Sequence, residues 1–163
     1  MNWHLVLPLI SGIIMAAAYP PAITPFFIWV SIIPLLIFIK TEQSRKRLLW
    51  GSFSGGLIYG SIITRWVFSI LPIDWILISN AVSVSFTIVY WISIAIIIGS
   101  SWMFFSISVS YFLSHHDWLA RRFLYVGIPA LWIIIEHIST LLITILWANA
   151  ESGFAAHWTF GSM

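Results

Sequence analysis

Cysteine is absent from the 163 residues of this sequence. Disulfide bonds, thiolate-bound metal ions and a cysteine nucleophile are therefore excluded within it. Other metal-ligand types occur side by side at His115, His116 and Asp117, but no ligand set of suitable geometry surrounds them, so a solvated loop is expected there. The sequence also has no phosphate-binding loop, nucleotide fingerprint or internal repeat. We accordingly expect no metal ion and no cofactor.

Charged residues are scarce, at 7% of the chain, whereas hydrophobic residues make up 61%. A soluble globular domain carries about 25% charged residues, so this chain cannot cover a water-facing surface with charge. Its seven Lys and Arg residues are too few for a nucleic-acid interface. Six of them fall in two clusters, at 40–47 and at Arg121 and Arg122, which is typical of membrane topology. The sequence therefore predicts an integral membrane protein that binds no nucleic acid.

Two short apolar stretches open the chain, at 5–18 and 26–39, and Tyr19, Pro20 and Pro21 follow the first. Each stretch is about 14 residues long, shorter than the roughly 20 that an upright transmembrane helix needs. They form either a tilted hairpin or a re-entrant pair that turns at the double proline. Both alternatives return the chain to its starting side, which the basic segment 40–47 marks as cytoplasmic. The N-terminus is thus expected in the cytoplasm.

A glycine-rich third span is predicted over 48–68, leading outward. Its small residues recur at intervals of four, a spacing that lets a second helix approach closely; they are Gly51 and Gly55, and Ser52, Gly56 and Gly60. We expect the four glycines to pack against other helices of the same chain. A homodimer formed through this helix is the alternative.

The long segment 75–114 contains no formal charge. As one straight helix it would run about 60 Å, twice the thickness of the hydrocarbon core. It either crosses twice, turning at 99–101, or crosses once with 75 to about 85 lying along the outer interface. The single crossing is preferred because it keeps both basic clusters in the cytoplasm.

The last predicted span, 123–146, runs outward again. The architecture expected from the sequence is all-α and polytopic, with about five transmembrane helices, or three and a re-entrant pair. The membrane domain comprises 1–146, and 147–163 is an external tail, the start of a truncated loop.

Arg65 and Glu136 are the two formal charges inside predicted spans, where charge is expensive. Helical rise places both about 20–25 Å from the inner ends of their spans, which allows them to pair if 75–114 crosses once. An ion pair or snorkelling side chains that fix helix packing is the favoured interpretation. A polar lining for a lipid head group or acyl ester, and acid–base chemistry, are the alternatives.

Three stretches carry more specific patterns. Residues 11–36 hold small side chains, an aromatic–proline turn and an apolar run ending in Pro-Leu-Leu, and the glycine-rich 48–70 contains the group Trp66, Val67 and Phe68. Residues 129–139 read Pro-Ala-Leu-Trp, three apolar residues and Glu. In this order the stretches resemble the N-terminal membrane domain of bacterial apolipoprotein N-acyltransferase.

The resemblance is incomplete at two places. The family usually follows the glutamate with a hydrophobic residue and Arg, where this chain has His137, Ile138 and Ser139, so an arginine-dependent role is not carried over. Beyond Trp147 the family's aromatic loop is only faintly echoed before the sequence stops at Met163. A fragment, or one half of a split enzyme, is therefore expected.

The resemblance implies a reaction as well as a fold. The family transfers a fatty acyl chain from a phospholipid to the N-terminal diacylglyceryl-cysteine of a lipoprotein. It does so through a thioester on a catalytic cysteine, assisted by Glu and Lys, in an external nitrilase-like domain. A thioester needs a thiolate, which this chain lacks, so no catalytic residue is assigned.

What the resemblance implies here is an acyltransferase membrane domain, inactive alone, in the bacterial inner membrane. Phospholipid and lipoprotein are the implied substrates, and the nitrilase-like domain is missing or lies on another chain. Arg65, Trp66, Trp132 and Glu136 are the candidates for a lateral lipid entrance.

The sequence is also compatible with two other functions. The first is a non-enzymatic membrane protein that binds lipid or a partner helix through its glycine-rich helix. A small transporter needs polar sites near mid-membrane and usually an internal repeat, of which only Glu136 is present. Serines within 79–110 offer a polar path, but hydrogen bonds to their own helix carbonyls are expected instead.

Overall fold

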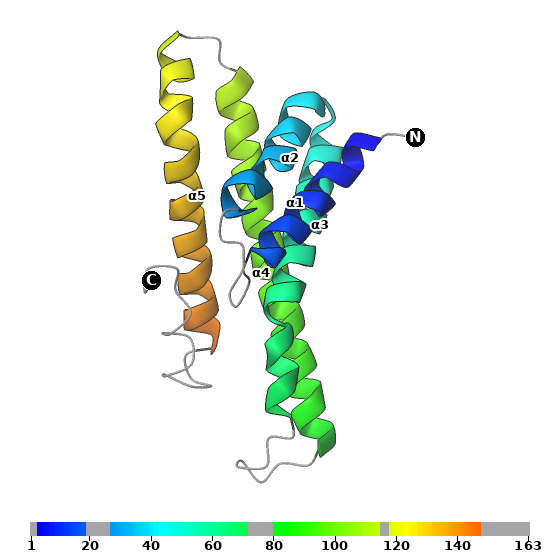
Figure 1. Cartoon of the computed structure of the whole chain (residues 1–163). Coiled ribbons are helices and arrows are strands. Elements are labelled where there is room, and N and C mark those ends of the chain that lie inside the picture. The colour runs from blue at the N-terminus through cyan, green and yellow to red at the C-terminus, as the bar shows by residue number, and fades with distance from the viewer. Residues whose placement is uncertain (1–2, 19–26, 72–79, 115–117, 148–163) are drawn as a thin grey trace. The chain divides into compact units, whose positions relative to one another are not determined.

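The computed structural model describes residues 3–18, 27–71, 80–114 and 118–147. Every element in these ranges is helical, as predicted (Figure 1). In chain order they are η1 (Trp3–Val6), α1 (Leu7–Ala17), α2 (Phe27–Thr41), α3 (Arg45–Ile63), η2 (Arg65–Ile70), α4 (Asn80–Ser114) and α5 (Trp118–Trp147). They belong to two compact units, Met1–Ser110 and Tyr111–Met163, which are described separately below.

The helices α1 and α2 pack together and match the two short apolar stretches. Pro34 lies inside α2, where it cannot donate the usual backbone hydrogen bond to the carbonyl of residue 30. The hydroxyl of Ser11, on α1, donates to the next carbonyl along, that of Ser31, and both serines are fully buried. The Ser11 hydroxyl thus links α1 to α2 close to the point where Pro34 removes a backbone hydrogen bond from α2. In apolar surroundings such side-chain hydrogen bonds replace the missing backbone ones.

Helix α3 contacts three other helices through its glycines. Gly51 faces Phe38 of α2, Gly55 faces Pro8 of α1, and Gly56 faces Trp102 of α4. A Cβ atom at Gly51 would lie 2.5 Å from the Phe38 ring, and one at Gly56 would lie 2.6 Å from Cγ of Trp102. Both aromatic side chains are buried, at 0% and 2% exposure. The close approach of these helices therefore requires glycine.

The predicted third span is not one uninterrupted α-helix. The α-helical part ends at Ile63, and Arg65–Ile70 form the 3-10 helix η2 (Figure 1). The hydroxyl of Thr64, the residue that follows α3, donates to the carbonyl of Gly60 at 2.6 Å. Leu71 is extended, as expected for a residue that precedes proline. The stretch predicted as the third span is therefore α-helical up to Ile63 and 3-10 helical from Arg65.

The long uncharged segment forms a single helix from Asn80 to Ser114. It is continuous through 99–101, so the alternative with a turn there is wrong. Residues 80–85 belong to the same helix, which also corrects the separate interface segment expected up to about 85; residues 75–79 lie outside the described residues. At 1.5 Å per residue α4 is about 52 Å long, well above the roughly 30 Å of a hydrocarbon core.

Two helices are long and apolar enough to cross a membrane among the described residues: Asn80–Ser114 and Val126–Trp147. In their most apolar windows only 22% and 6% of residues are buried. The core helix of a soluble protein would be mostly covered, whereas helices in a bilayer expose apolar side chains to lipid. The helices α1 and α2 are shorter, and α3 is not among the candidate spans, so a count of five crossings stays a prediction.

Candidate functional site

Arg65 and Trp66, two of the predicted entrance residues, begin the 3-10 helix η2. The Arg65 side chain is exposed, Trp66 is half-buried and Val67 is 5% exposed. The chain therefore anchors η2 through Val67 and leaves a guanidinium group beside an indole at its surface. Such a pair suits the membrane interface, where cationic and aromatic side chains meet head groups.

Glu136 and Trp132, the other two entrance candidates, are one turn apart on α5. The Trp132 side chain hydrogen-bonds the Glu136 carboxylate, and both residues are half-buried. Thr140 Oγ1 donates to the Glu136 carbonyl at 3.0 Å, and Ser139 Oγ donates to the carbonyl of Ile135 at 2.6 Å. Glu136 follows Trp132 by four residues, and Ser139 and Thr140 follow Glu136 by three and four. These spacings place all four residues along one side of the helix.

Apart from His137, the exposed large side chains on the rest of α5 are apolar over the predicted span. The exposed large side chains there include Ile133, Ile138, Leu141, Leu142 and Ile145. His137 is exposed, next to Glu136 in sequence but about 100° away around the helix. The helix thus has one polar stripe on a surface suited to lipid.

The predicted pairing of Arg65 with Glu136 joins two different units, Met1–Ser110 and Tyr111–Met163. It therefore stays a prediction, as does the assembly of all four residues into one entrance. The His115–Asp117 run lies outside the described residues, as does the tail after Trp147.

The four glycines predicted to pack helices all lie within the first unit. Gly51, Gly55 and Gly56 contact α2, α1 and α4 as described above, and a Cβ at Gly60 would lie 3.0 Å from Cα of Ala95 on α4. Gly99 of α4 is close to Phe53 of α3 in turn. These contacts are within one chain and leave no room at Gly55 or Gly56 for a second copy.

The hydroxyl groups of α4 mostly bond to the backbone of their own helix. Ser85, Ser93 and Ser100 each donate to a carbonyl three or four residues earlier, at 2.8 to 2.9 Å. Ser83 and Ser106 are buried, and their hydroxyls have no hydrogen-bond partner within the described ranges. Ser85, Ser93 and Ser100 therefore follow the prediction.

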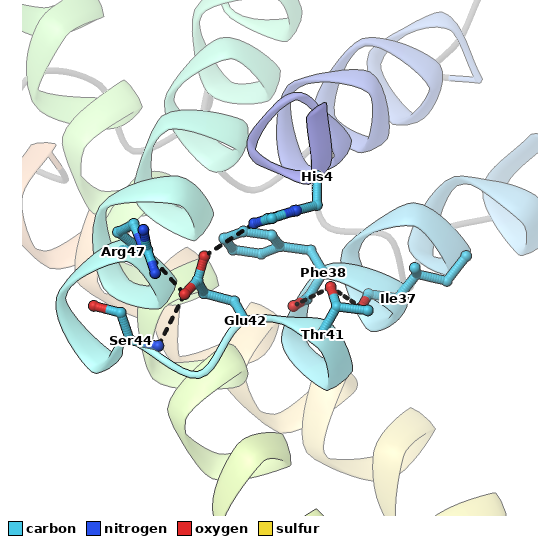
Figure 2. A network of polar contacts seen from close by, with 7 residues as sticks. All are labelled: His4, Ile37, Phe38, Thr41, Glu42, Ser44 and Arg47. Carbon is cyan, nitrogen blue, oxygen red and sulfur yellow. Dashed lines mark hydrogen bonds and ion pairs between the residues drawn. The ribbon is translucent and has the colours of Figure 1, made fainter. Parts of the chain in front are cut away.

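A polar cluster that sequence reasoning missed lies between α2 and α3 (Figure 2). Glu42 is 7% exposed, and its Oε1 accepts hydrogen bonds from the Ser44 amide at 2.8 Å and from Arg47 Nε at 3.1 Å. Its Oε2 lies 3.5 Å from His4 Nε2, an ion pair when the imidazole is protonated. The carboxylate therefore joins the N-terminal η1 to the first turn of α3.

Burial by itself would raise the pKa of the Glu42 carboxyl. The Ser44 amide, the Arg47 guanidinium and then His4 outweigh it and lower that pKa below 4.5. Although its atoms are covered, Glu42 lies at the end of the helices where little protein surrounds it, so nearby water screens these charges. The available signal in the sequence was a lone acid inside the basic segment 40–47.

No group of three or more His, Cys, Asp and Glu side chains that could hold a metal ion is found in the described part of the chain. Its polar groups include the Glu42 cluster, the exposed Arg65 guanidinium and the Trp132–Glu136 pair. Such an arrangement can bind a head group or orient an ester.

Comparison with known proteins identifies the family. Residues 11–161 match the family model described as the apolipoprotein N-acyltransferase N-terminal domain. An apolipoprotein N-acyltransferase of Gloeobacter violaceus is 31% identical over 98 residues, 60% of this chain and 16% of that protein. Apolipoprotein N-acyltransferase 1 of Treponema denticola is 28% identical over 74 residues, 43% of this chain and 13% of that protein.

No solved structure matches the chain. The chain spans only a small part of the length of the relatives it matches, whereas the family model covers nearly all of it. Together with the helical fold and the apolar spans, this match shows that the chain belongs to the apolipoprotein N-acyltransferase family, of which it carries the N-terminal domain.

Proposed function

We propose that this chain is the membrane domain of an apolipoprotein N-acyltransferase of the bacterial inner membrane. In the complete enzyme a phospholipid ester gives its acyl group to a cysteine thiolate, and the lipoprotein α-amine then takes the acyl group from that thioester. These residues contain no cysteine, so the thiolate comes from outside them. The observation that carries the proposal is the family match over residues 11–161.

The domain's own contribution is to receive the phospholipid. Arg65 presents an exposed cation beside Trp66 at the end of α3, which suits the phosphate of a head group. Trp132 and Glu136 interrupt the apolar surface of α5 with a hydrogen-bonded polar pair. Polar groups inside a span are costly and usually mark a functional site, so we assign a role in receiving lipid to each pair.

Acyl transfer from a labelled phospholipid to a diacylglyceryl lipopeptide tests this function. The chain is reconstituted with the remaining part of the Gloeobacter violaceus relative, supplied as a fusion that replaces the matching stretch. We expect activity from the wild-type fusion, and losses of about ten- to a hundredfold for Arg65→Leu and for Glu136→Leu, because a displaced lipid reacts poorly.

Phe104→Leu is the matched control, since Phe104 is 65% exposed and apolar. It should leave activity unchanged. Wild-type rates in both charge variants would show that the entrance has been assigned to the wrong residues. An inactive but folded wild-type fusion would contradict the proposed function itself.

A further inference from the structure

The end of α3 has carbonyl groups that a continuing helix would have bonded. The last carbonyls of an α-helix lack partners from its own backbone, and in α3 these follow Gly60, whose carbonyl still accepts the Thr64 amide. The Gly60 carbonyl accepts from both the amide and the hydroxyl of Thr64, at 3.1 and 2.6 Å. The Ser61 carbonyl accepts from Trp91 Nε1 of α4 at 2.9 Å.

Trp91 makes a second contact, on the other side of the break. Its ring lies edge to face with that of Phe68 in η2, with centroids 5.5 Å apart and planes at 67°. This is a favourable aromatic geometry that adds to simple burial. One side chain of α4 therefore contacts the chain before the break, at Ser61, and after it, at Phe68.

The position of Trp91 is itself fixed by close helix packing. Trp91 and Ala95 are four residues apart and share a face of α4. A Cβ at Gly60 would lie 3.0 Å from Cα of Ala95, so α3 and α4 are nearly in backbone contact one turn from the indole. Trp91 thus has a rigid base from which to hold η2.

Arg65 and Trp66 lie in the short stretch between these two contacts. We propose that Trp91 is a positioning residue: its indole N–H and ring hold η2 against α4 and so fix the direction in which Arg65 and Trp66 face the lipid. The inference deepens the proposed function and depends on it for the role of Arg65. The fixing of η2 by Trp91 is a physical claim that can be tested without any acyl transfer.

Spin labelling tests the physical claim in the full chain reconstituted in lipid nanodiscs. Because the chain has no cysteine, Ser69→Cys gives a single nitroxide site on η2. Ser85→Cys on α4 is the matched reporter, since both serines are exposed and bond only to their own helix backbone. Trp91→Phe removes the N–H donor and keeps an aromatic ring.

We expect Trp91→Phe to raise the mobile population at residue 69 by about two- to tenfold, the range for one lost hydrogen bond. The label at residue 85 should not change. Trp50→Phe is the control substitution because Trp50 is 61% exposed and distant from η2 in sequence. Phe68→Leu removes only the ring contact and should have a smaller effect in the same direction. This second variant keeps the test valid if the Trp91→Phe protein fails to fold.

A kinetic measurement separates positioning from general destabilisation. In the active fusion, Trp91→Phe should raise KM for phospholipid by about two- to tenfold and leave kcat within about twofold, as expected when ground-state and transition-state binding are lost equally. Unchanged mobility at residue 69 in both Trp91→Phe and Phe68→Leu would overturn the inference. Raised mobility with an unchanged KM would confirm that Trp91 holds η2 and would instead contradict the entrance role of Arg65.

Discussion

Helices α3 and α5 both lie in apolar surroundings, but their side chains make different kinds of contact. Helix α3 is held by contacts with α1, α2 and α4, and glycine makes each of these contacts possible. In α5, a Cβ at Gly127 would meet nothing within 4 Å, and the polar side chains of its polar stripe bond within their own helix. Close glycine contacts with other helices thus characterise α3, whereas the Ser139 and Thr140 hydroxyls of α5 bond to the backbone of their own helix.

The difference between the two helices predicts how an added methyl group should change the stability of the protein. In α3 an added methyl group displaces a neighbouring backbone, because interiors of this density have no spare volume. In α5 the same methyl group enters open space and acts only on helix propensity. Matched substitutions in the two helices should thus differ in sign as well as in size.

Gly55→Ala should have the largest effect on stability. Its Cβ would collide with the backbone carbonyl of Pro8, and backbone atoms cannot move aside as a flexible side chain can. We expect a loss of about 1–3 kcal/mol or more in unfolding free energy, measured by denaturant titration in mixed micelles with circular dichroism. Ser54→Ala, one residue earlier and half-buried, is the control. A Gly55→Ala protein as stable as the wild type would contradict the packing of α1 on α3.

Glu42→Gln should have a smaller effect that depends on pH. The folded-state pKa of Glu42 is lowered from 4.5 by Ser44, Arg47 and His4 despite its burial. Its contribution to stability is therefore complete above 4.5 and is lost as the pH falls through the lower folded-state value. After allowance for screening we expect on the order of 1 kcal/mol at neutral pH.

The measurement is the unfolding free energy between neutral and acidic pH for the wild type and the variant. The wild type should lose stability on acidification, and the two curves should converge at the acidic end. Gln43→Ala, at the exposed neighbouring position, should follow the wild-type curve. Parallel curves that never converge would mean that the Glu42 charge does not carry the effect.

Much of the helical pattern was predictable because it follows from local chemistry. Apolar runs and prolines predicted 5–18 and 26–39, and α1 with η1 and α2 lie within one or two residues of those limits. The glycine spacing predicted close helix packing, and α5 begins five residues before the predicted 123. These features need only hydropathy, periodicity and the restrictions of proline.

The missed features depend wholly or in part on partners distant in sequence. Ser11 bonds to Ser31 across 20 positions, and Trp91 bonds to Ser61 across 30. The break at Thr64 is stable because α4 supplies a donor to the freed carbonyl, and no periodicity in 48–68 signals that donor. The Glu42 cluster likewise needs His4, which folding brings from 38 positions away.

Gly127→Ala should have the smallest effect, opposite in sign to that of Gly55→Ala. Gly127 lies inside α5, two residues before Pro129, with open space where a Cβ would be. Glycine costs a helix about 0.5–1 kcal/mol relative to alanine through backbone entropy, so the variant should be more stable by up to that amount. The same micelle titration measures it. A destabilised Gly127→Ala protein would mean that another helix or partner covers this face of α5. Helices α3 and α5 would then both be held by close packing and would differ only in which partner they contact.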